Sequence, residues 1–377
     1  MILQVQTYLR SGKTLQDLNS ELGINARRHS KLPNLVSLKY NQLESPRNHP
    51  VVMECRGLIL DEANDWDIVA FPFKRFFNAD EGFAADIDWS TAKVQEKVDG
   101  SLIILYYYAG QWHVATSGSA DAGGSVGDGL EWRENGIRIL PHPESFAQYF
   151  WQTATKCYGP DFHLDAKTDH CYMLELTGPL NRIVVYHEKA SLTVLGARRL
   201  SDLQEISAKE AASHLRGVPA VKEFDLSSVG EIVATFEDIS PLSQEGYVAH
   251  DAVFNRIKVK SPGYVAIHHA KDGLTTKAFV EIARSGEVFE VVAHFPEYQP
   301  PLEEAKERFQ SLLQELQQEY EGIKHIQNQK EFALQAVKSR CSGALFAYRA
   351  GKVSSIGEFL KSMHIDKMMK LLGYKNE

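Results

Sequence analysis

The chain has 377 residues, of which 44% are hydrophobic and 24% charged, and its formal net charge at pH 7 is −8. This balance predicts a folded protein of two to three domains, and it excludes a protein that binds nucleic acid over its whole surface. The four cysteines show no Cys-x-x-Cys spacing, which argues against a zinc knuckle. No apolar run has membrane-spanning length, and the first residues lack the apolar core of a signal peptide. We therefore expect a soluble, cytoplasmic protein with no membrane partner.

Residues 1–265 are expected to form an α+β domain built on antiparallel sheets. Apolar runs of four to eight residues, bounded by Gly, Asp or Asn, are typical of strands. Such runs occur at 35–41, 57–60, 68–71, 102–108, 172–176, 183–186, 192–195 and 247–254. Helical patterns interrupt them at 143–156 and 201–215.

Residues 266–377 are expected to form a small all-helical domain. Over 302–320 the apolar residues recur at the spacing of one helical face, and a second helical pattern covers 355–372. The proline-rich stretch 294–301 is expected to join the two regions.

A lysine stands in the segment Glu-Lys-Val-Asp-Gly-Ser (96–101), directly before the apolar run 102–108. Lysine at the entrance of a buried strand is unusual, because this side chain prefers solvent. A nucleophilic lysine must lose its proton, and bringing a pKa of about 10.4 near 7 requires roughly 4 kcal/mol from neighbouring cations or a metal. Gly100 would let a ligand approach the backbone closely. Taken alone, the short pattern Lys-x-Asp-Gly favours a simple turn.

Charged residues also stand in the strand patterns downstream. Glu175 lies inside an apolar run, where a carboxylate is costly unless a ribose hydroxyl, a metal or a salt bridge satisfies it. Lys258 and Lys260 alternate along a strand and share one face, as a phosphate clamp requires, although a solvated strand face shows the same alternation. Residues 252–280 carry five basic residues and one acidic residue, which indicates a local site for phosphate or chance clustering.

The order Lys-x-Asp-Gly, strand glutamate, Glu-Gly and Lys-x-Lys resembles the motifs of the covalent nucleotidyltransferases, which include polynucleotide ligases and mRNA capping enzymes. From about residue 40 to 264 the chain more specifically resembles the ATP-dependent RNA ligase 1 family, typified by the tRNA-repair ligase of T-even phages. Further family-like segments are Met-Glu-Cys-Arg-Gly (53–57), Phe-Phe-Asn (76–78), Asn-Arg-Ile-Val (181–184) and Lys-Ser-x-x-Tyr (260–264). The resemblance implies an antiparallel-sheet nucleotidyltransferase domain of the ATP-grasp-like ligase type, followed by a helical domain with a role in RNA specificity.

The resemblance also implies roles for individual residues. Lys97 would attack the α-phosphate of ATP and hold AMP as a phosphoramidate. Glu175 would bind the ribose, Lys258 would contact the α-phosphate, and Glu245 would help to place the catalytic Mg²⁺ or Mn²⁺. The other residues that the resemblance places around the nucleotide are Tyr40, Arg56, Arg75, Phe77, Gly100 and Lys260.

Two positions depart from the family pattern. Arg75, beside Lys74, stands where the family has a lysine before Phe-Phe-Asn, and arginine is not interchangeable with lysine at a phosphate. Ser117 stands where the family often carries a basic residue after the first motif strand. A later reaction step would then be slower unless Arg133 or another base takes over this contact.

The activity implied is the joining of RNA 3′-hydroxyl and 5′-phosphate ends by a monomeric ligase, with nicked tRNA as a candidate substrate. The Ser-Gly-Lys-Thr at 11–14 lacks the first glycine of a P-loop, so end healing would require a separate kinase-phosphatase partner. A DNA ligase or a capping enzyme is the alternative, but an OB-fold of short strands would then follow the last lysine motif, where this sequence is helical. A non-catalytic RNA-binding protein is a more distant alternative, which predicts the loss of motif residues that are all present here.

Overall fold

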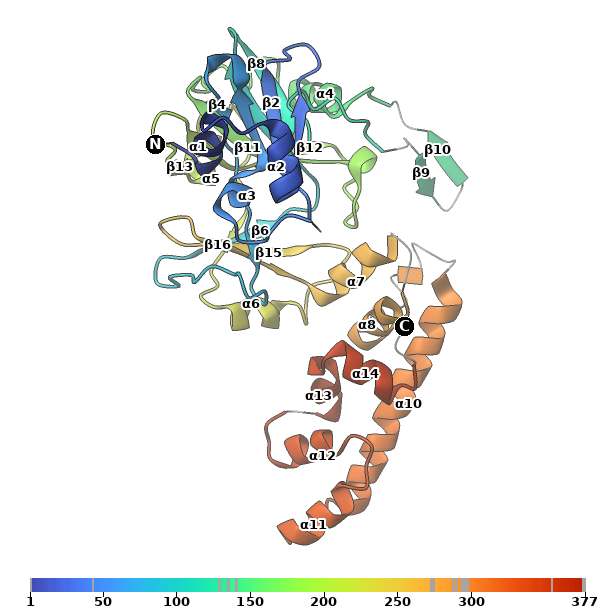
Figure 1. Cartoon of the computed structure of the whole chain (residues 1–377). Coiled ribbons are helices and arrows are strands. Elements are labelled where there is room, and N and C mark those ends of the chain that lie inside the picture. The colour runs from blue at the N-terminus through green and yellow to red at the C-terminus, as the bar shows by residue number, and fades with distance from the viewer. Residues whose placement is uncertain are drawn as a thin grey trace. The chain divides into compact units, whose positions relative to one another are not determined.

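The computed structural model describes residues 2–374 except 43, 128–129, 134–135, 140–141, 272–274, 287, 289–290, 293–297 and 354. The chain divides into two compact units, the first made of residues 1–237 with 243–260 and the second of residues 238–242 with 261–377 (Figure 1). A search of the described helices finds none that is both long and apolar enough to cross a membrane.

The first sheet of the first unit is antiparallel, in the order β1-β2-β3-β4. Its strands are β1 (Ile24–Arg28), β2 (Leu35–Tyr40), β3 (Arg56–Asp61) and β4 (Asp67–Ala70). Helices α1 (Gln4–Arg10), α2 (Leu15–Leu22) and α3 (Pro50–Glu54) bury their apolar residues against one face of this sheet. The Ser-Gly-Lys-Thr segment lies between α1 and α2, where Thr14 caps α2 by accepting a hydrogen bond from the Asp17 backbone N–H.

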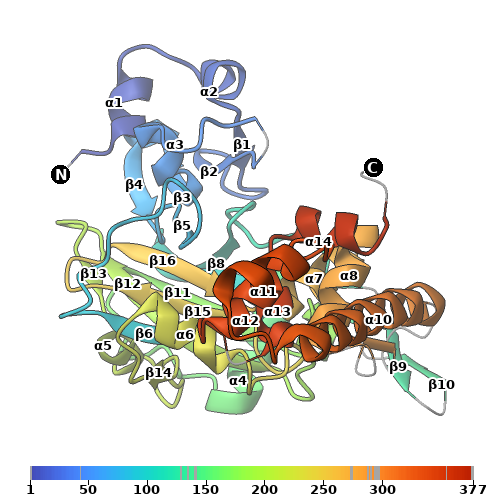
Figure 2. The same cartoon turned by 90° about the horizontal axis from the view of Figure 1, so that it is seen from below.

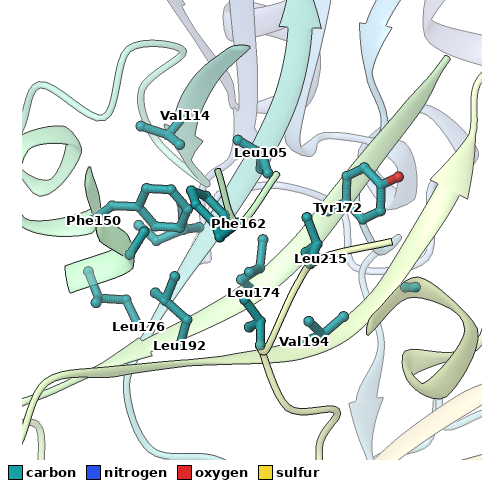
Figure 3. Packing of buried hydrophobic residues seen from close by; sticks show 14 of the residues in the cluster. Leu105, Val114, Phe150, Phe162, Tyr172, Leu174, Leu176, Leu192, Val194 and Leu215 are labelled. Atoms are coloured by element: carbon teal, nitrogen blue, oxygen red, sulfur yellow. The ribbon is translucent and has the colours of Figure 1, made fainter. Parts of the chain in front are cut away.

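The second sheet is also antiparallel, in the order β13-β12-β11-β7-β8. Its strands are β7 (Ser101–Tyr108), β8 (Gln111–Thr116), β11 (His170–Thr177), β12 (Ser191–Arg199) and β13 (Glu205–Ile206). On one face Leu174 and Leu176 of β11 pack with Phe150 of α4 (Phe146–Tyr158) (Figure 3). On the other face Met173 packs in a cluster that includes Ile59 of the first sheet. All eight residues of β11 are therefore buried, and its odd-numbered residues, including Glu175, face the first sheet.

The third sheet brings the lysine motifs together, in the order β14-β6-β15-β16-β5 (Figure 2). Its strands are β5 (Phe77–Asn78), β6 (Lys93–Lys97), β14 (Glu223–Phe224), β15 (Gly246–His250) and β16 (Arg256–Lys260). Gly246 pairs with Lys97 on one side and with Lys260 on the other. A Cβ on Gly246 would lie 2.2 Å from the carbonyl oxygen of Val259, so this central position requires glycine.

The shorter elements of the first unit lie between these strands. They are η1 (Glu62–Asn64), the hairpin β9 (Leu130–Arg133) and β10 (Gly136–Ile139), η2 (Pro179–Asn181), α5 (Ala208–Ala212) and α6 (Val229–Thr235).

The second unit is helical among its described residues. Its helices are α7 (Pro262–Lys271), α8 (Thr276–Ser285), α10 (Gln299–Ile323), α11 (Gln329–Ala336), α12 (Ser342–Arg349), α13 (Ile356–Ser362) and α14 (Ile365–Leu371). Helix α10 buries one face, including Phe309, Leu312 and Leu316, and α8, α11, α12 and α13 pack along it. Of the predicted joint at 294–301, Tyr298 is the N-cap of α10, residues 299–301 begin this helix, and 294–297 lie outside the described residues.

The α+β class, the antiparallel sheets and the helical C-terminal region are confirmed, but four local predictions are wrong. Residues 183–186 are irregular, and the backbone N–H groups of Val184 and Val185 bond to a side chain described below and not to a neighbouring strand. Over 201–215 only α5 is helical, and β13 precedes it. The pattern at 355–372 forms two helices, since Met363 is extended and His364 caps α14. The strand predicted over 247–254 ends at His250. The short strand β5 also adds one parallel pair to the third sheet.

Candidate active site

A pocket of about 330 Å³ lies within the first unit, between strands of its three sheets. Seven of the ten residues singled out from the sequence line it: Tyr40, Arg56, Lys97, Gly100, Glu175, Lys258 and Lys260. Glu245 lies beneath the lysines, whereas Arg75 and Phe77 do not line the pocket.

The Glu245 carboxylate joins two of the lysines. Its Oε2 lies 2.6 Å from Nζ of Lys97, and its Oε1 lies 2.7 Å from Nζ of Lys260. Burial alone would raise the pKa of Glu245, but the charges and hydrogen bonds of the two lysines outweigh burial and lower this pKa. The carboxylate is therefore ionised at neutral pH. It holds both ammonium groups where strands β6 and β16 of the third sheet end.

Glu175 is the second buried acid of the site. Its residue in β11 pairs with Leu102 of β7, which also lines the pocket. Burial raises the pKa of Glu175 to about 8, against the opposing charge of Lys97 and with the support of the Glu245 charge. This side chain is consequently a neutral carboxylic acid near pH 7, which can both donate and accept a hydrogen bond.

Two cations of the pocket are held in unfavourable surroundings. Burial, followed by the charges of Lys260 and Lys97, lowers the pKa of Lys258 to about 8. Burial also lowers the pKa of Arg56, and its Nη1 is buried with no hydrogen-bond partner among the described residues. A buried donor without a partner costs free energy. A ligand that offers this Nη1 a hydrogen-bond acceptor removes that cost, which favours its binding.

Arg75 and Phe77 lie behind the wall of the pocket. The guanidinium carbon of Arg75 lies 4.2 Å from the centre of the Tyr40 ring and 5.2 Å from that of the Phe77 ring. Of the two adjacent phenylalanines, Phe76 lines the pocket, and its ring lies 5.1 Å from the Arg56 guanidinium carbon. Arg75 thus lies against the Tyr40 and Phe77 rings in this structure, and a direct nucleotide contact for Arg75 or Phe77 remains a prediction.

The loop that carries Lys97 is held from below by the family-like segment 181–184. The Asp99 carboxylate accepts hydrogen bonds from the backbone N–H groups of Val184 (2.9 Å) and Val185 (2.7 Å). The Asn181 amide donates to the carbonyl oxygen of Leu176 at 2.6 Å. A Cβ on Gly100 would lie 2.5 Å from that same carbonyl oxygen, so the close approach of loop and strand requires glycine here.

Sequence reasoning missed several residues of the pocket wall. Arg256 alternates with Lys258 and Lys260 along β16, so the strand period could have identified it. Its guanidinium pairs with Glu205 and lies 4.3 Å from the centre of the Phe73 ring. Lys39 also lines the pocket, and its lone position before Tyr40 gave no periodic signal. Ser117, noted as a departure, lies in the wall as well.

Comparisons with known proteins place this geometry in context. A family model described as RNA ligase matches residues 54–264. The chain is 24% identical over 383 aligned residues to an RNA ligase of Rhodothermus phage RM378, covering 84% of this chain and 86% of that protein. It is 30% identical over 356 residues to a putative bifunctional polynucleotide kinase/RNA ligase of Autographa californica nuclear polyhedrosis virus, covering 89% of this chain but only 48% of the viral protein.

Among solved structures, an archaeal ATP-dependent RNA ligase (form 2) matches with a TM-score of 0.48 at 14% identity, over 83% of this chain and 82% of that one. A Naegleria gruberi RNA ligase with pyrophosphate matches with a TM-score of 0.34 at 16% identity, over 48% of this chain and 52% of that one.

Proposed function

This chain belongs to the RNA ligase family, and we propose that it joins RNA 3′-hydroxyl and 5′-phosphate ends through AMP linked to Lys97. The observation that carries this proposal is the ionised, buried Glu245, which holds Lys97 and Lys260 in a pocket rich in further cations. The matching family is that of RNA ligases and not of DNA ligases or capping enzymes, which supports RNA as the acceptor.

The proposed reaction has three steps at phosphorus. In the first, Nζ of Lys97 attacks the α-phosphorus of ATP, so that an N–P bond forms and the bond to pyrophosphate breaks. In the second, an oxygen of the RNA 5′-phosphate attacks the same phosphorus, which forms a P–O–P linkage and releases Lys97. In the third, the RNA 3′-hydroxyl attacks the 5′-phosphorus, which forms the phosphodiester and expels AMP. Such transfers depend mainly on positioning and charge neutralisation, which the cations of the pocket would supply.

The first step requires Lys97 as the neutral amine. In the structure this Nζ lies 2.6 Å from Oε2 of Glu245, so the nitrogen that must attack is held by a carboxylate. We therefore propose that Lys97 must leave Glu245 before it attacks. Glu175, as a neutral acid, would bind the ribose, while Lys258 and Arg56 would bind the α-phosphate.

Glu245 is the residue that we propose to hold Mg²⁺ or Mn²⁺. Mg²⁺ often takes only one or two protein carboxylates and completes its shell with waters and substrate phosphates. The described residues contain no group of three or more His, Cys, Asp or Glu side chains arranged for a metal, so a metal here would take its other ligands from the nucleotide. When bound, such a metal would neutralise charge on the triphosphate.

Covalent labelling tests the proposal. Protein stripped of AMP with pyrophosphate is incubated with α-labelled ATP and Mg²⁺, then separated on a denaturing gel. We expect a labelled band that Lys97→Ala abolishes and that Lys93→Ala retains, because Lys93 lies on the same strand β6 but outside the pocket. Labelled protein is next given 5′-phosphorylated single-stranded RNA or DNA, and transfer to RNA is expected. A stripped wild type that stays unlabelled would contradict the ligase proposal and favour the non-catalytic alternative.

The substrate proposed is broken RNA, including nicked tRNA, whose ends have already been healed. The viral relative is described as a putative bifunctional polynucleotide kinase/RNA ligase, and the matched part spans about half of its length. The present sequence has no intact P-loop motif, so we propose that a kinase-phosphatase outside these 377 residues prepares the ends. Sealing of RNA with a 5′-hydroxyl by this protein alone would contradict that division of labour.

The helical region, residues 266–377, is proposed to select the RNA. In α11 and α12 the exposed side chains include Leu334 and Phe346, and residues 328–352 carry five basic residues and one acidic residue. Apolar and basic side chains on one short segment are typical of single-stranded RNA contacts. Replacing Phe346 by Ala is expected to weaken binding of nicked tRNA and to leave lysyl-AMP formation unchanged.

A further inference from the structure

Lys39 is a cation of the pocket that the roles proposed above do not use. It lies in β2, where it pairs with Arg56 of β3, and both residues line the pocket. Its side chain is exposed, whereas Arg56 is partly buried and its Nη1 is shielded from solvent. Lys39 therefore extends the positive charge of the first sheet toward solvent.

The surroundings of Lys39 differ from those of the other pocket cations. Lys97 and Lys260 are paired with Glu245, and Arg256 is paired with Glu205. In the part of the chain that the structure describes, no carboxylate pairs with Lys39. Its charge is thus available to an anion that enters the pocket.

The wall that faces Lys39 is neutral and open. Nζ of Lys39 lies 3.8 Å from the position that a Cβ on Gly118 would occupy. The neighbouring Ser117 lines the pocket and carries a hydroxyl only. Ser117 and Gly118 therefore leave space but supply no charge, and the ammonium that reaches this part of the pocket comes from β2.

We propose that Lys39 binds the substrate phosphate that lies on the solvent side of the Lys97–AMP linkage, either the departing pyrophosphate or the 5′-phosphate of the RNA. The inference rests on the proposed function and adds a residue to it. Lysine suits this place because its ammonium is a mobile point charge that can follow a phosphate which enters and leaves in each cycle. The more enclosed Lys258 and Arg56 suit the α-phosphate, which stays throughout.

The test compares Lys39→Ser and Lys39→Arg with wild type, and uses Lys93→Ser as the control for loss of an exposed lysine. Three rates are measured on stripped or AMP-loaded protein: lysyl-AMP formation from ATP, release of ATP on adding pyrophosphate, and AMP transfer to 5′-phosphorylated RNA. We expect Lys39→Ser to slow at least one of them about tenfold or more, as loss of a charge-assisted hydrogen bond predicts. A defect in the pyrophosphate reaction alone identifies pyrophosphate as the group bound, and a defect in transfer alone identifies the RNA end. Lys39→Arg keeps the positive charge and should therefore retain more of the wild-type rate than Lys39→Ser.

A charge relocation completes the test. In the double variant Lys39→Ser with Ser117→Lys, the ammonium returns to the same part of the pocket from the facing wall, and the lost rate should largely recover. Equal rates for Lys39→Ser and wild type in all three assays would overturn the proposal. A Lys39→Arg variant as slow as Lys39→Ser, or a double variant with no recovery, would overturn it too, because the positive charge beside residue 117 would then not be what matters. Labelling of the wild type by ATP tests the ligase chemistry itself and does not depend on how the rates of the Lys39 variants compare with wild type. The two proposals can therefore fail separately.

Discussion

The buried acid Glu175 makes the stability of the first unit depend on pH in a predictable direction. Its pKa is raised from 4.5 to about 8, mainly by burial. The folded protein thus favours the protonated form, and the stability that this proton confers is fully present below about pH 4.5 and lost as the pH rises through about 8. Glu175→Gln keeps a neutral side chain of the same shape at every pH. Relative to this variant, wild type should lose on the order of 3 to 5 kcal/mol of unfolding free energy between pH 4.5 and pH 9.

Urea unfolding followed by tryptophan fluorescence measures this effect. All five tryptophans lie within residues 1–237, so their signal reports the first unit. The free energy of unfolding of wild type and Glu175→Gln is compared at pH 5, 7 and 9, with Glu188→Gln as the control, because Glu188 is exposed. We expect the free energy of unfolding of Glu175→Gln to increase relative to that of wild type as the pH rises. That of Glu188→Gln should change with pH as wild type does. A difference between Glu175→Gln and wild type that is the same at all three pH values would refute the raised pKa.

Two further predictions concern the loop and the phosphate contact. Gly100→Ala should destabilise the first unit by about 1 to 3 kcal/mol and slow lysyl-AMP formation, because its Cβ would lie 2.5 Å from the Leu176 carbonyl oxygen. Gly82→Ala, with nothing within 4 Å of its Cβ, should change neither quantity in the same assays, and equal effects of the two substitutions would contradict the packing argument. The pKa of Lys258 is about 8 in the ligand-free protein, so kcat/KM for lysyl-AMP formation should fall above pH 8 as this ammonium loses its proton. Lys258→Arg should remove that decline in the pH–rate profile, and an unchanged profile would exclude Lys258 as its source.

The sequence predicted strands and helices correctly where the pattern of apolar residues matches the residues that the fold buries. The eight residues of β11 and the long amphipathic face of α10 are such cases. The strand predicted at 183–186 was wrong because an apolar run of four residues does not show which acceptors its backbone N–H groups bond to. Here the acceptor is Asp99, which is 85 residues away from Val184 in the chain. The continuous helix predicted over 355–372 was wrong for a similar reason. The pattern of apolar residues does not show that the His364 side chain accepts a local hydrogen bond and so begins a new helix.

The site could be predicted as a set of residues but not as a geometry. The motif order indicated Lys97, Glu175, Glu245, Lys258 and Lys260. The pairing of Gly246 with both Lys97 and Lys260 explains how two lysines so far apart in the chain come together. No pattern in one sequence shows which of two adjacent phenylalanines faces the pocket. The strand β5 turns Phe77 away and leaves Phe76 in the wall, because β5 is held by its parallel pairing with β16.

The protonation states of the site indicate what kind of ligand it is built for. The buried positions of Glu175 and Lys258 both favour neutral forms, and Nη1 of Arg56 is a buried donor with no hydrogen-bond partner among the residues that the structure describes. A ligand that carried positive charge would further disfavour the ammonium of Lys258 and would bring no acceptor to Arg56, and a neutral one would leave the charge deficit of Lys258 in place. A polyphosphate relieves both deficits, because its negative charge favours the ammonium of Lys258 and its oxygens accept from Arg56. A ribose hydroxyl beside Glu175 would meet a group that can both donate and accept a hydrogen bond. The same burial that lowers stability at high pH therefore favours a ligand that brings phosphate oxygens to Lys258 and Arg56 and a hydrogen-bonding group to Glu175.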